Sequence, residues 1–351
     1  MPNNIIPVIT GVNCITPMGD GAEITAESIK DGIGELEFSD SFFDLKQNAV
    51  KIALIDGFKE NEPDSHKLFM NEAFAGCFSD FLEKSLGNSF EAEIIYLFLG
   101  LSSTQRPGIQ FDIKPLIDQL KPCCSEIITE KFTTGNPSAI NALEKSVEII
   151  KANPDAICIV GAVDSLLNQD TLDWFEKDQR LNSEDSKRPH GFCPSQAVSF
   201  FSVESKKAAI NRKRAILAEI TGFKTAKEPS SFVSGLPSKG EGLTNAVRGG
   251  LENGNVKPES INHVFCDLNG EFYRSKEWGF AEIRCLGKSD NIRELWSPSD
   301  CMGNIGAASA GVLLSIVSEG LNKNWLDKNV LVFSSDDHGD CGAVVLSGVE
   351  V

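Results

Sequence analysis

The sequence predicts an α/β protein, because apolar runs of strand length alternate with helical patterns. Three of these runs are nearly continuous, which is typical of strands that are covered on both faces. They lie at residues 5–12 (IIPVITGV), 93–101 (EIIYLFLGL) and 156–160 (AICIV). Between the last two, residues 137–151 carry apolar side chains at helical spacing. A chain of 351 residues can bury a large core, either as two similar-sized units or as one large domain.

The remaining elements continue this alternation. The strand at 5–12 is followed by a turn at 13–19 and a helix at 25–31, which glycines close. Residues 35–92 are rich in phenylalanine, which indicates core or the cover of a sheet, or alternatively the wall of an acyl pocket. The later expected elements are helices at 113–120, 206–210, 240–251 and within 166–180 and 304–321, and strands at 125–132, 197–203, 216–223, 262–266, 329–334 and 342–346, the last two forming a hairpin.

The turn before the helix at 137–151 is the most informative one. Its sequence is TTGNP, and Pro137 suits the first helical position, where its missing N–H would be unpaired anyway. Asn136 therefore stands directly before a helix N-terminus. After the strand at 156–160, Gly161 is expected to let the backbone turn.

Composition and charge exclude several classes of function. The formal net charge of −17 argues against nucleic acid and anionic membranes as partners, and it weakens the case for an acidic acyl carrier protein. No apolar run reaches the length of about 18 residues that a membrane span needs. The N-terminal MPNNIIPVITGV lacks the features of a signal peptide. Ten cysteines without a CxxC pair fit buried thiols in a reducing cytosol, so a cytoplasmic location is expected.

Neither a cofactor nor a metal ion is expected. The four histidines are far apart and show no ligand spacing. The chain also contains no P-loop and no GxGxxG motif, so nucleotide binding has no support.

The stretch at residues 133–166 resembles the β-ketoacyl-ACP synthases of the thiolase superfamily. In that family a reactive cysteine sits on a sharp turn and opens a buried helix. A strand that ends in small residues and an acid follows, and GAVD at residues 161–164 matches it. A second match lies near the N-terminus, where a strand and the turn TPMG at residues 16–19 precede a helix. The resemblance runs patchily from about residue 7 to residue 346.

This resemblance implies a thiolase-like fold of five αβαβα layers. The fold would contain two pseudo-repeated halves, residues 1–205 and 206–351, within one structural unit. The resemblance also implies a dimer formed through a strand near the nucleophile turn. The second subunit would be another copy of the chain or a ketosynthase-like protein.

Every catalytic position of the family is changed in this chain. Counting back from the strand at 156–160 without gaps places Asn136 on the family cysteine. The first family histidine falls on Asp267 or, after a two-residue slip, on Asn269, and the second falls on Asn304. An amide has no usable pKa near neutrality, although it can hold a buried hydrogen-bond network. Condensation needs a thiolate and two imidazoles, so it is not expected here.

Residues 266–280 (CDLNGEFYRSKEWGF) bring charged and aromatic side chains to the mouth of the former active site. One interpretation is an ion-paired cap with an aromatic cover. Another is a rebuilt recognition site for a peptide or a partner loop. A third is new catalysis, in which His338 with a nearby aspartate and Cys341 or Ser335 forms a nucleophile–base set. The candidate binding residues are Asp267, Asn269, Glu271, Arg274 and His338.

A basic segment lies where the second half begins. It could bind a phosphopantetheine carrier, or it could be a solvated helix face. Its cations are Lys206, Lys207, Arg212, Lys213 and Arg214.

The sequence therefore predicts a β-ketoacyl-synthase-like pseudoenzyme. It would act as a partner subunit akin to chain-length factors, or as a binding adaptor with a protein client. By resemblance alone, relatives with a DLNGE-like stretch belong with bacterial secretion-effector gene clusters. The alternative is an enzyme with a non-standard active site, either an acyltransferase of the 3-oxoacyl-ACP synthase type or a malonyl-thioester decarboxylase.

Overall fold

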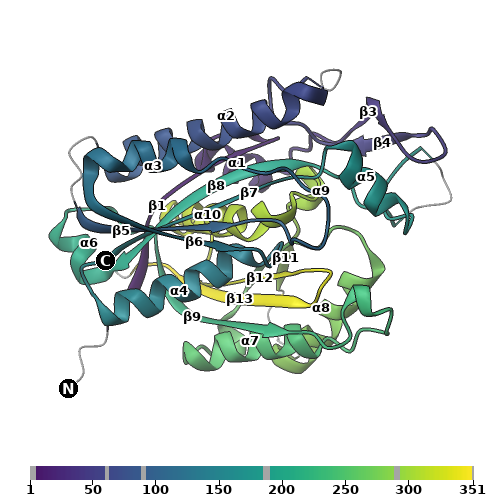
Figure 1. Cartoon of the computed structure of the whole chain (residues 1–351). Helices are drawn as coiled ribbons and strands as arrows, with labels where there is room; N and C mark the ends of the chain where they lie inside the picture. Colours follow the sequence, from purple (N-terminus) through teal and green to yellow (C-terminus); the bar gives the residue numbers. More distant parts are fainter. Residues whose placement is uncertain (1–4, 60–62, 88–91, 185–189, 288–292, 350–351) are drawn as a thin grey trace.

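The computed structural model describes residues 5–59, 63–87, 92–184, 190–287 and 293–349. Helices form three layers, and strands fill the two spaces between these layers (Figure 1). This arrangement confirms the predicted five-layer α/β fold. The outer layers are α2 (Pro63–Phe81) with α3 (Lys114–Leu120) on one side and α7 (Glu241–Asn253) with α8 (Phe272–Cys285) on the other, and the middle layer is α4 (Ser138–Ala152) with α10 (Ser309–Asn322).

In the described part of the chain, ten of the eleven strands of the large sheet divide into two sets of five that follow one another in the sequence. The first set is β1 (Pro7–Thr16), β5 (Ala92–Gly100), β6 (Cys124–Phe132), β7 (Ile157–Ser165) and β8 (Gln196–Ser205). The second set is β9 (Ala218–Lys227), β10 (His263–Cys266), β11 (Glu294–Trp296), β12 (Asn329–Ser335) and β13 (Asp340–Ser347).

Both sets have the same order and the same strand directions. From edge to centre the first runs β6-β5-β7-β8-β1 and the second runs β11-β10-β12-β13-β9. In each set the two outer pairings are parallel and the two inner ones are antiparallel. The sets meet where β1 pairs with β9 at Val8 and Ile9. The shared topology confirms two pseudo-repeated halves, and a boundary between residues 205 and 206 stays a prediction.

Shorter elements connect and decorate these layers. They are β2 (Gly19–Asp20), α1 (Ala22–Lys30), the hairpin β3 (Glu37–Phe43) and β4 (Ala49–Ile52), η1 (Leu82–Leu86), η2 (Lys121–Cys123), α5 (Gln169–Glu176), α6 (Lys206–Asn211), η3 (Phe232–Ser234), η4 (Pro258–Ser260), α9 (Ser299–Met302) and η5 (Gly306–Ala308).

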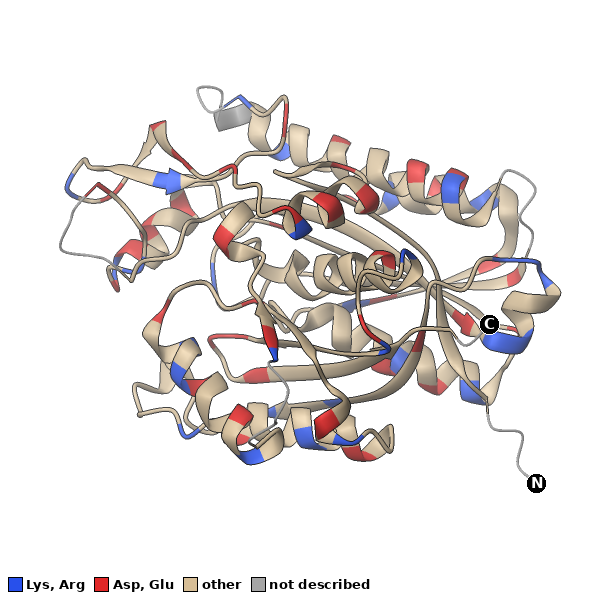
Figure 2. Ribbon diagram, turned by 180° about the vertical axis from the view of Figure 1, so that it is seen from behind, with Lys and Arg blue, Asp and Glu red and all other residues tan. Residues whose placement is uncertain are grey.

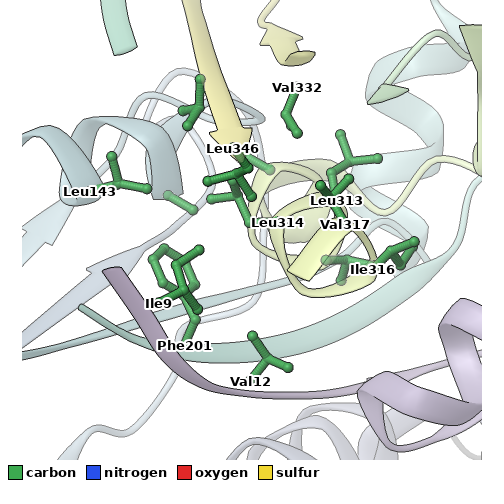
Figure 3. Close-up of a cluster of buried hydrophobic side chains, with 14 of the residues drawn as sticks. Ile9, Val12, Leu143, Phe201, Leu313, Leu314, Ile316, Val317, Val332 and Leu346 are labelled. Carbon is green, nitrogen blue, oxygen red and sulfur yellow. The ribbon is translucent and has the colours of Figure 1, made fainter. Parts of the chain in front are cut away.

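Helix α10 is the centre of the largest core. Nearly all of its residues are buried, as expected for a helix that is apolar on every side. Its side chains lie between residues of both halves, such as Ile9 and Phe201 from the first and Val332 and Leu346 from the second (Figure 3). This shared core explains why the two halves pack as layers around one central pair of helices.

Two predicted turns are in fact strand. The turn expected at residues 13–19 begins only after Thr16, because β1 continues its antiparallel pairing with β8 up to Ile15. Gly161 does not turn the chain but lies inside β7. A Cβ on Gly161 would lie 2.4 Å from a ring carbon of Phe200, so the glycine allows a close approach of that ring.

The phenylalanines of residues 35–92 differ in burial. Phe74, Phe78 and Phe81 on α2 are fully buried, and their rings pack around Phe200. Phe38 and Phe43, on the β3–β4 hairpin, are exposed. Phe42 on the same hairpin is buried, so the core interpretation is correct for these α2 residues and for Phe42 and wrong for Phe38 and Phe43.

Charged residues of both signs lie along the outer helices and loops (Figure 2). Among the residues that the structure describes, no helix is long and apolar enough to cross a membrane.

Candidate functional site

Asn136 lies on a sharp turn at the start of the buried helix α4. The preceding Gly135 has a left-handed φ of 69°, and a Cβ there would overlap the carboxylate of Asp336. Asn136 is buried, and its Nδ2 donates a hydrogen bond to Oδ2 of Asp267 at 2.9 Å. The turn thus holds an amide where a helix N-terminus, the β10–α8 connection and the β12–β13 connection meet.

Asp267 directly follows β10 and is buried. Besides Asn136, it accepts hydrogen bonds from Ser334 Oγ at 2.7 Å and from the backbone N–H of Ser335. Burial raises the pKa of Asp267, against the opposing effects of Arg274 and these hydrogen bonds. Asn269, the other residue that the alignment left open, instead exchanges hydrogen bonds with Glu271. Of the two, it is Asp267 that contacts Asn136.

Asn304 and Asn136 both line one small cavity. Oδ1 of Asn304 accepts the backbone N–H of Gly306, and the backbone N–H of Asn304 donates to the carbonyl of Cys193. Nearby, the buried Asp164 at the end of β7 accepts hydrogen bonds from Arg106 and from the N–H of Ala307. Asp164, the acid at the end of the GAVD motif, therefore connects the segment of Arg106 with that of Ala307.

Two buried arginines dominate the mouth of the site. Arg180 binds Glu271 through Nε and Nη2 at 2.7 and 2.9 Å, and it binds Asp337 through Nη1 and Nη2 at 2.6 and 3.0 Å. Arg274 donates to Asp337 at 2.9 Å and to the carbonyl of Ser335. We call Arg180, Glu271, Arg274 and Asp337 the ionic cluster. It joins the segment after α5, the start of α8 and the β12–β13 connection.

Aromatic rings surround the guanidinium of Arg180. Its Cζ lies 4.2 Å from the ring centroid of Phe232, 5.1 Å from that of Phe175 and 5.5 Å from that of Phe192. Cation–π contacts of this kind strengthen when the cation is desolvated, and Arg180 is buried. The rings and carboxylates together hold Arg180 in a single position.

The site contains more carboxyl groups than cations. Burial alone would raise the pKa of Asp337, but the charges of Arg180 and Arg274 outweigh it and lower the pKa to about 2. Burial raises the pKa of Glu277 to about 7, although Ser335 and Arg274 act in the opposite direction. Burial also raises the pKa of Asp336. The two arginines therefore keep Asp337 ionised, whereas the carboxyl groups of Asp267, Glu277 and Asp336 bind protons more tightly than usual.

The cavity beside Asn136 is very small. Its volume is about 20 Å³, and it is lined by Asn136, Asn304, Arg180, Arg274 and His338 among others. A single water needs roughly 10–15 Å³, whereas ligand pockets usually measure about 300–1,000 Å³. A larger hollow of about 770 Å³ lies elsewhere, between β1, η1 and residues 212–217, and shares no residue with this site.

The structure brings most of the candidate binding residues together. Glu271 and Arg274 belong to the ionic cluster, Asn269 supports Glu271, and His338 lines the cavity. The arrangement has the geometry of an ion-paired cap with an aromatic cover. A metal site is not formed, since no group of three His, Cys, Asp or Glu side chains in the described ranges is placed to hold an ion.

The proposed nucleophile–base set is not assembled. Ser335 Oγ and Cys341 Sγ both donate to Glu277, at 2.7 and 4.0 Å, and neither bonds to His338. Within the described part of the chain, His338 Nδ1 has no hydrogen-bond partner. Burial raises the pKa of Cys341 well above its ordinary value, so its thiol is inert near neutrality.

The basic segment is largely neutralised by nearby carboxylates. Arg212 and Arg214 both pair with the buried Glu204, at 2.6 and 3.3 Å. Lys206 pairs with Glu219 at 2.6 Å. These pairs favour a structural role for the segment over the docking of a carrier.

Arg180 and Phe232 are the main residues that the sequence analysis missed. Arg180 lies at the end of a polar stretch with no motif, and its partners Glu271 and Asp337 are 91 and 157 positions away. An excess of buried carboxylates would have indicated that a buried arginine is needed. That excess becomes visible only in the folded structure.

Known proteins that resemble the chain are 3-oxoacyl-[acyl-carrier-protein] synthases in sequence and ketosynthases in fold. No family model matches it. It is 21% identical over 162 residues to a 3-oxoacyl-[acyl-carrier-protein] synthase homolog of Saccharomyces cerevisiae, covering 45% of this chain but only 34% of the yeast protein. It is 19% identical over 355 residues to 3-oxoacyl-[acyl-carrier-protein] synthase 2 of Staphylococcus aureus, covering 89% of this chain and 84% of that protein.

Solved structures agree over almost the whole length. A ketosynthase from a type II polyketide synthase, solved with its acyl-carrier protein and bound to the hexaketide, matches with a TM-score of 0.76 at 16% identity, covering 98% of this chain and all of that one. The ishigamide ketosynthase/chain length factor matches with a TM-score of 0.75 at 15% identity, covering 99% of this chain and all of that one. With the repeated topology described above, these matches show that the chain has the fold of a ketosynthase, and its sequence is similar to that of a 3-oxoacyl-[acyl-carrier-protein] synthase over most of its length.

Proposed function

We propose that this ketosynthase-like protein does not condense acyl groups and acts instead as a partner subunit or binding adaptor. The observation that carries the proposal is the cavity of about 20 Å³ at Asn136, where a condensing enzyme must admit an acyl chain. Arg180, Arg274 and Asp337 of the ionic cluster line this cavity, and the ring of Phe232 packs against Arg180.

The available chemistry supports the same conclusion. Claisen condensation needs a thiolate to carry the acyl group and donors that stabilise the developing charge. Among the described residues that line the cavity there is one imidazole, that of His338, and no thiol. Burial raises the pKa of the nearby thiols of Cys193, Cys266 and Cys341, so none of them supplies a thiolate near neutral pH.

The first expected result is that the protein is silent towards thioesters. When it is incubated with acyl- and malonyl-thioesters, we expect no covalent acyl adduct by mass spectrometry and no release of CO2 above the buffer rate. The Asn136→Cys variant should also fail to form an adduct, because the cavity remains too small for the acyl group. Acylation or decarboxylation by the unaltered protein would instead establish the alternative, an acyltransferase or a malonyl-thioester decarboxylase.

We further propose that the protein dimerises through β6. This strand is the edge of its half of the sheet, and most of its residues are exposed, unlike those of β7 and β8, which are fully buried. An uncovered edge strand is a template for pairing with another strand. The second subunit would be a copy of this chain or a ketosynthase-like protein, and the matched ketosynthase/chain length factor is an example of such a pair.

The second expected result is that a charge on this edge disrupts the dimer. Ile128 on β6 has an exposed fraction of 37%, and we expect Ile128→Lys to convert a dimer into a monomer of 38.1 kDa in sedimentation equilibrium. Leu68→Lys, which changes an exposed leucine on α2, should leave the mass unchanged. An unaltered protein that is monomeric on its own would exclude the homodimer and require the ketosynthase-like partner.

A cytoplasmic location is part of the proposal, supported by ten cysteines that are all free thiols. A protein client and a bacterial secretion-effector context remain expectations from resemblance.

A further inference from the structure

Helix α8 has two faces with different chemistry. Its inner face carries Arg274, Glu277 and Trp278, which are buried against the ionic cluster and the second-half core. Its outer face carries Phe272 and Ile283, with exposed fractions of 72% and 75%. These are the highest values among the large apolar side chains in the described part of the chain. An ordinary surface helix would place polar residues at these two positions.

The segment that leads from β9 to α7 runs alongside α8. Tyr273 donates a hydrogen bond to the carbonyl of Ser230 near one end, and Arg284 donates to the carbonyl of Lys239 near the other. Between these anchors, Val233 and Leu236 have exposed fractions of 50% and 58%. The apolar surface of α8 therefore continues onto this segment.

Cations border this apolar surface. Lys276 and Arg284 lie over the ring of Phe280, at 5.9 and 5.1 Å from its centroid, and Lys239 is exposed on the adjacent segment. In the part of the chain that the structure describes, none of the three cations forms a salt bridge. Glu282 and Arg284 lie on opposite flanks of α8, on either side of Ile283, since successive residues are about 100° apart around a helix. In a chain of net charge −17, such a cationic apolar surface is a local exception.

We call this surface the α8 face, made of Val233, Leu236, Lys239, Phe272, Lys276, Ile283 and Arg284. We propose that it binds an acidic amphipathic helix of a partner protein, which names the kind of client that the proposed adaptor role requires. The apolar side of such a helix would cover Phe272 and Ile283, and its carboxylates would meet the three cations. Amphipathic helices are commonly recognised through apolar anchors that recur along one face of the bound helix.

The charge of the whole molecule favours a protein partner over a membrane. The net charge of −17 opposes any acidic partner, but a single helix would meet mainly the three local cations, whereas an extended anionic membrane would also face the rest of the negative molecule. The 14 residues of α8 span about 21 Å, which equals the length of about four turns of a partner helix. The α8 face is thus long enough for one such helix.

The test uses a fluorescent synthetic peptide of about 15 residues, with leucine on one helical face and glutamate on the other, and the full-length protein. We expect saturable binding by fluorescence anisotropy that weakens as salt is raised. Phe272→Ser combined with Ile283→Ser should weaken binding by about tenfold or more, because both side chains are exposed anchors. Lys276→Glu should weaken binding and reduce its salt dependence.

Matched controls make the result specific. Ile24→Ser and Leu68→Ser also remove exposed apolar side chains, at 50% and 61% exposure, and should leave binding unchanged. The proposal is overturned if the peptide does not bind, if a peptide with lysine in place of glutamate binds equally well, or if the double serine variant binds normally. It is also overturned if phosphatidylglycerol vesicles, rather than the peptide, bind through Phe272 and Ile283.

The binding test and the thioester test fail independently. If the peptide does not bind but the protein is silent towards thioesters, only the α8 face is excluded. If CO2 is released or an acyl adduct forms, the non-condensing role is wrong whatever the peptide does.

Discussion

Replacing Arg180 with methionine is expected to lower the free energy of unfolding by about 3–5 kcal/mol, the cost of removing one partner from a buried ion pair. Arg180 makes four hydrogen bonds to Glu271 and Asp337. Methionine keeps apolar contact with Phe175, Phe192 and Phe232 but supplies no donor. Glu271 and Asp337 would then share only Arg274, and two buried carboxylates would lose most of their compensation.

Urea unfolding at neutral pH measures this loss. Arg248→Met is the matched control, because Arg248 is exposed, and it should change stability by less than about 0.5 kcal/mol. Asp337→Asn should cost less in the Arg180→Met background than in the unaltered protein, since one of the two guanidinium groups that Asp337 faces is already gone and only Arg274 remains. An Arg180→Met loss no larger than that of the control would mean that the ionic cluster does not hold the mouth of the site closed.

The layers of the fold could be predicted from local patterns because the strands are covered on both faces. Fully buried strands such as β7 and β8 show as continuous apolar runs, and the hairpin of β12 and β13 shows as two such runs around a polar turn. Strand ends could not be predicted. β1 extends beyond Val12 because β8, more than 180 positions away, supplies partners as far as Ile15, and no local signal encodes that pairing.

The site could be predicted only in part for the same reason. The resemblance placed Asn136 beside a helix N-terminus and left Asp267 or Asn269 open, and the hydrogen bond from Asn136 to Asp267 distinguishes the two. Arg180 could not be predicted, because the carboxylates that make it necessary come from α8 and the β12–β13 connection. The size of the cavity likewise depends on how side chains from distant segments pack.

Glu277→Gln is expected to stabilise the protein above pH 7 and to remove part of its pH dependence. Glu277 is buried on the inner face of α8, accepts a hydrogen bond from Ser335, and faces Arg274 but also Glu228 and Asp267. Burial raises its pKa to about 7 from the ordinary 4.5, so the folded protein binds a proton that the unfolded chain has already lost. Its contribution to stability is therefore complete below about pH 4.5, and it is lost as the pH rises through 7.

The size of this effect follows from the shift. At about 1.4 kcal/mol for each pKa unit, ionising Glu277 costs the folded state on the order of 3 kcal/mol. Glutamine carries no charge at any pH and can still accept the hydrogen bond from Ser335, so the variant avoids this cost.

Subtracting the unfolding free energy of Glu277→Gln from that of the unaltered protein between pH 5 and pH 8 cancels the contributions of Asp267 and Asp336, whose pKa values are also raised. Glu282→Gln, on the same helix but only partly buried, serves as the control. If the difference stays flat across this range, or if it runs in favour of the unaltered protein as the pH rises, then Glu277 is ionised and compensated in the folded protein. In that case the balance of charge around Arg274 must be supplied by a different carboxyl group.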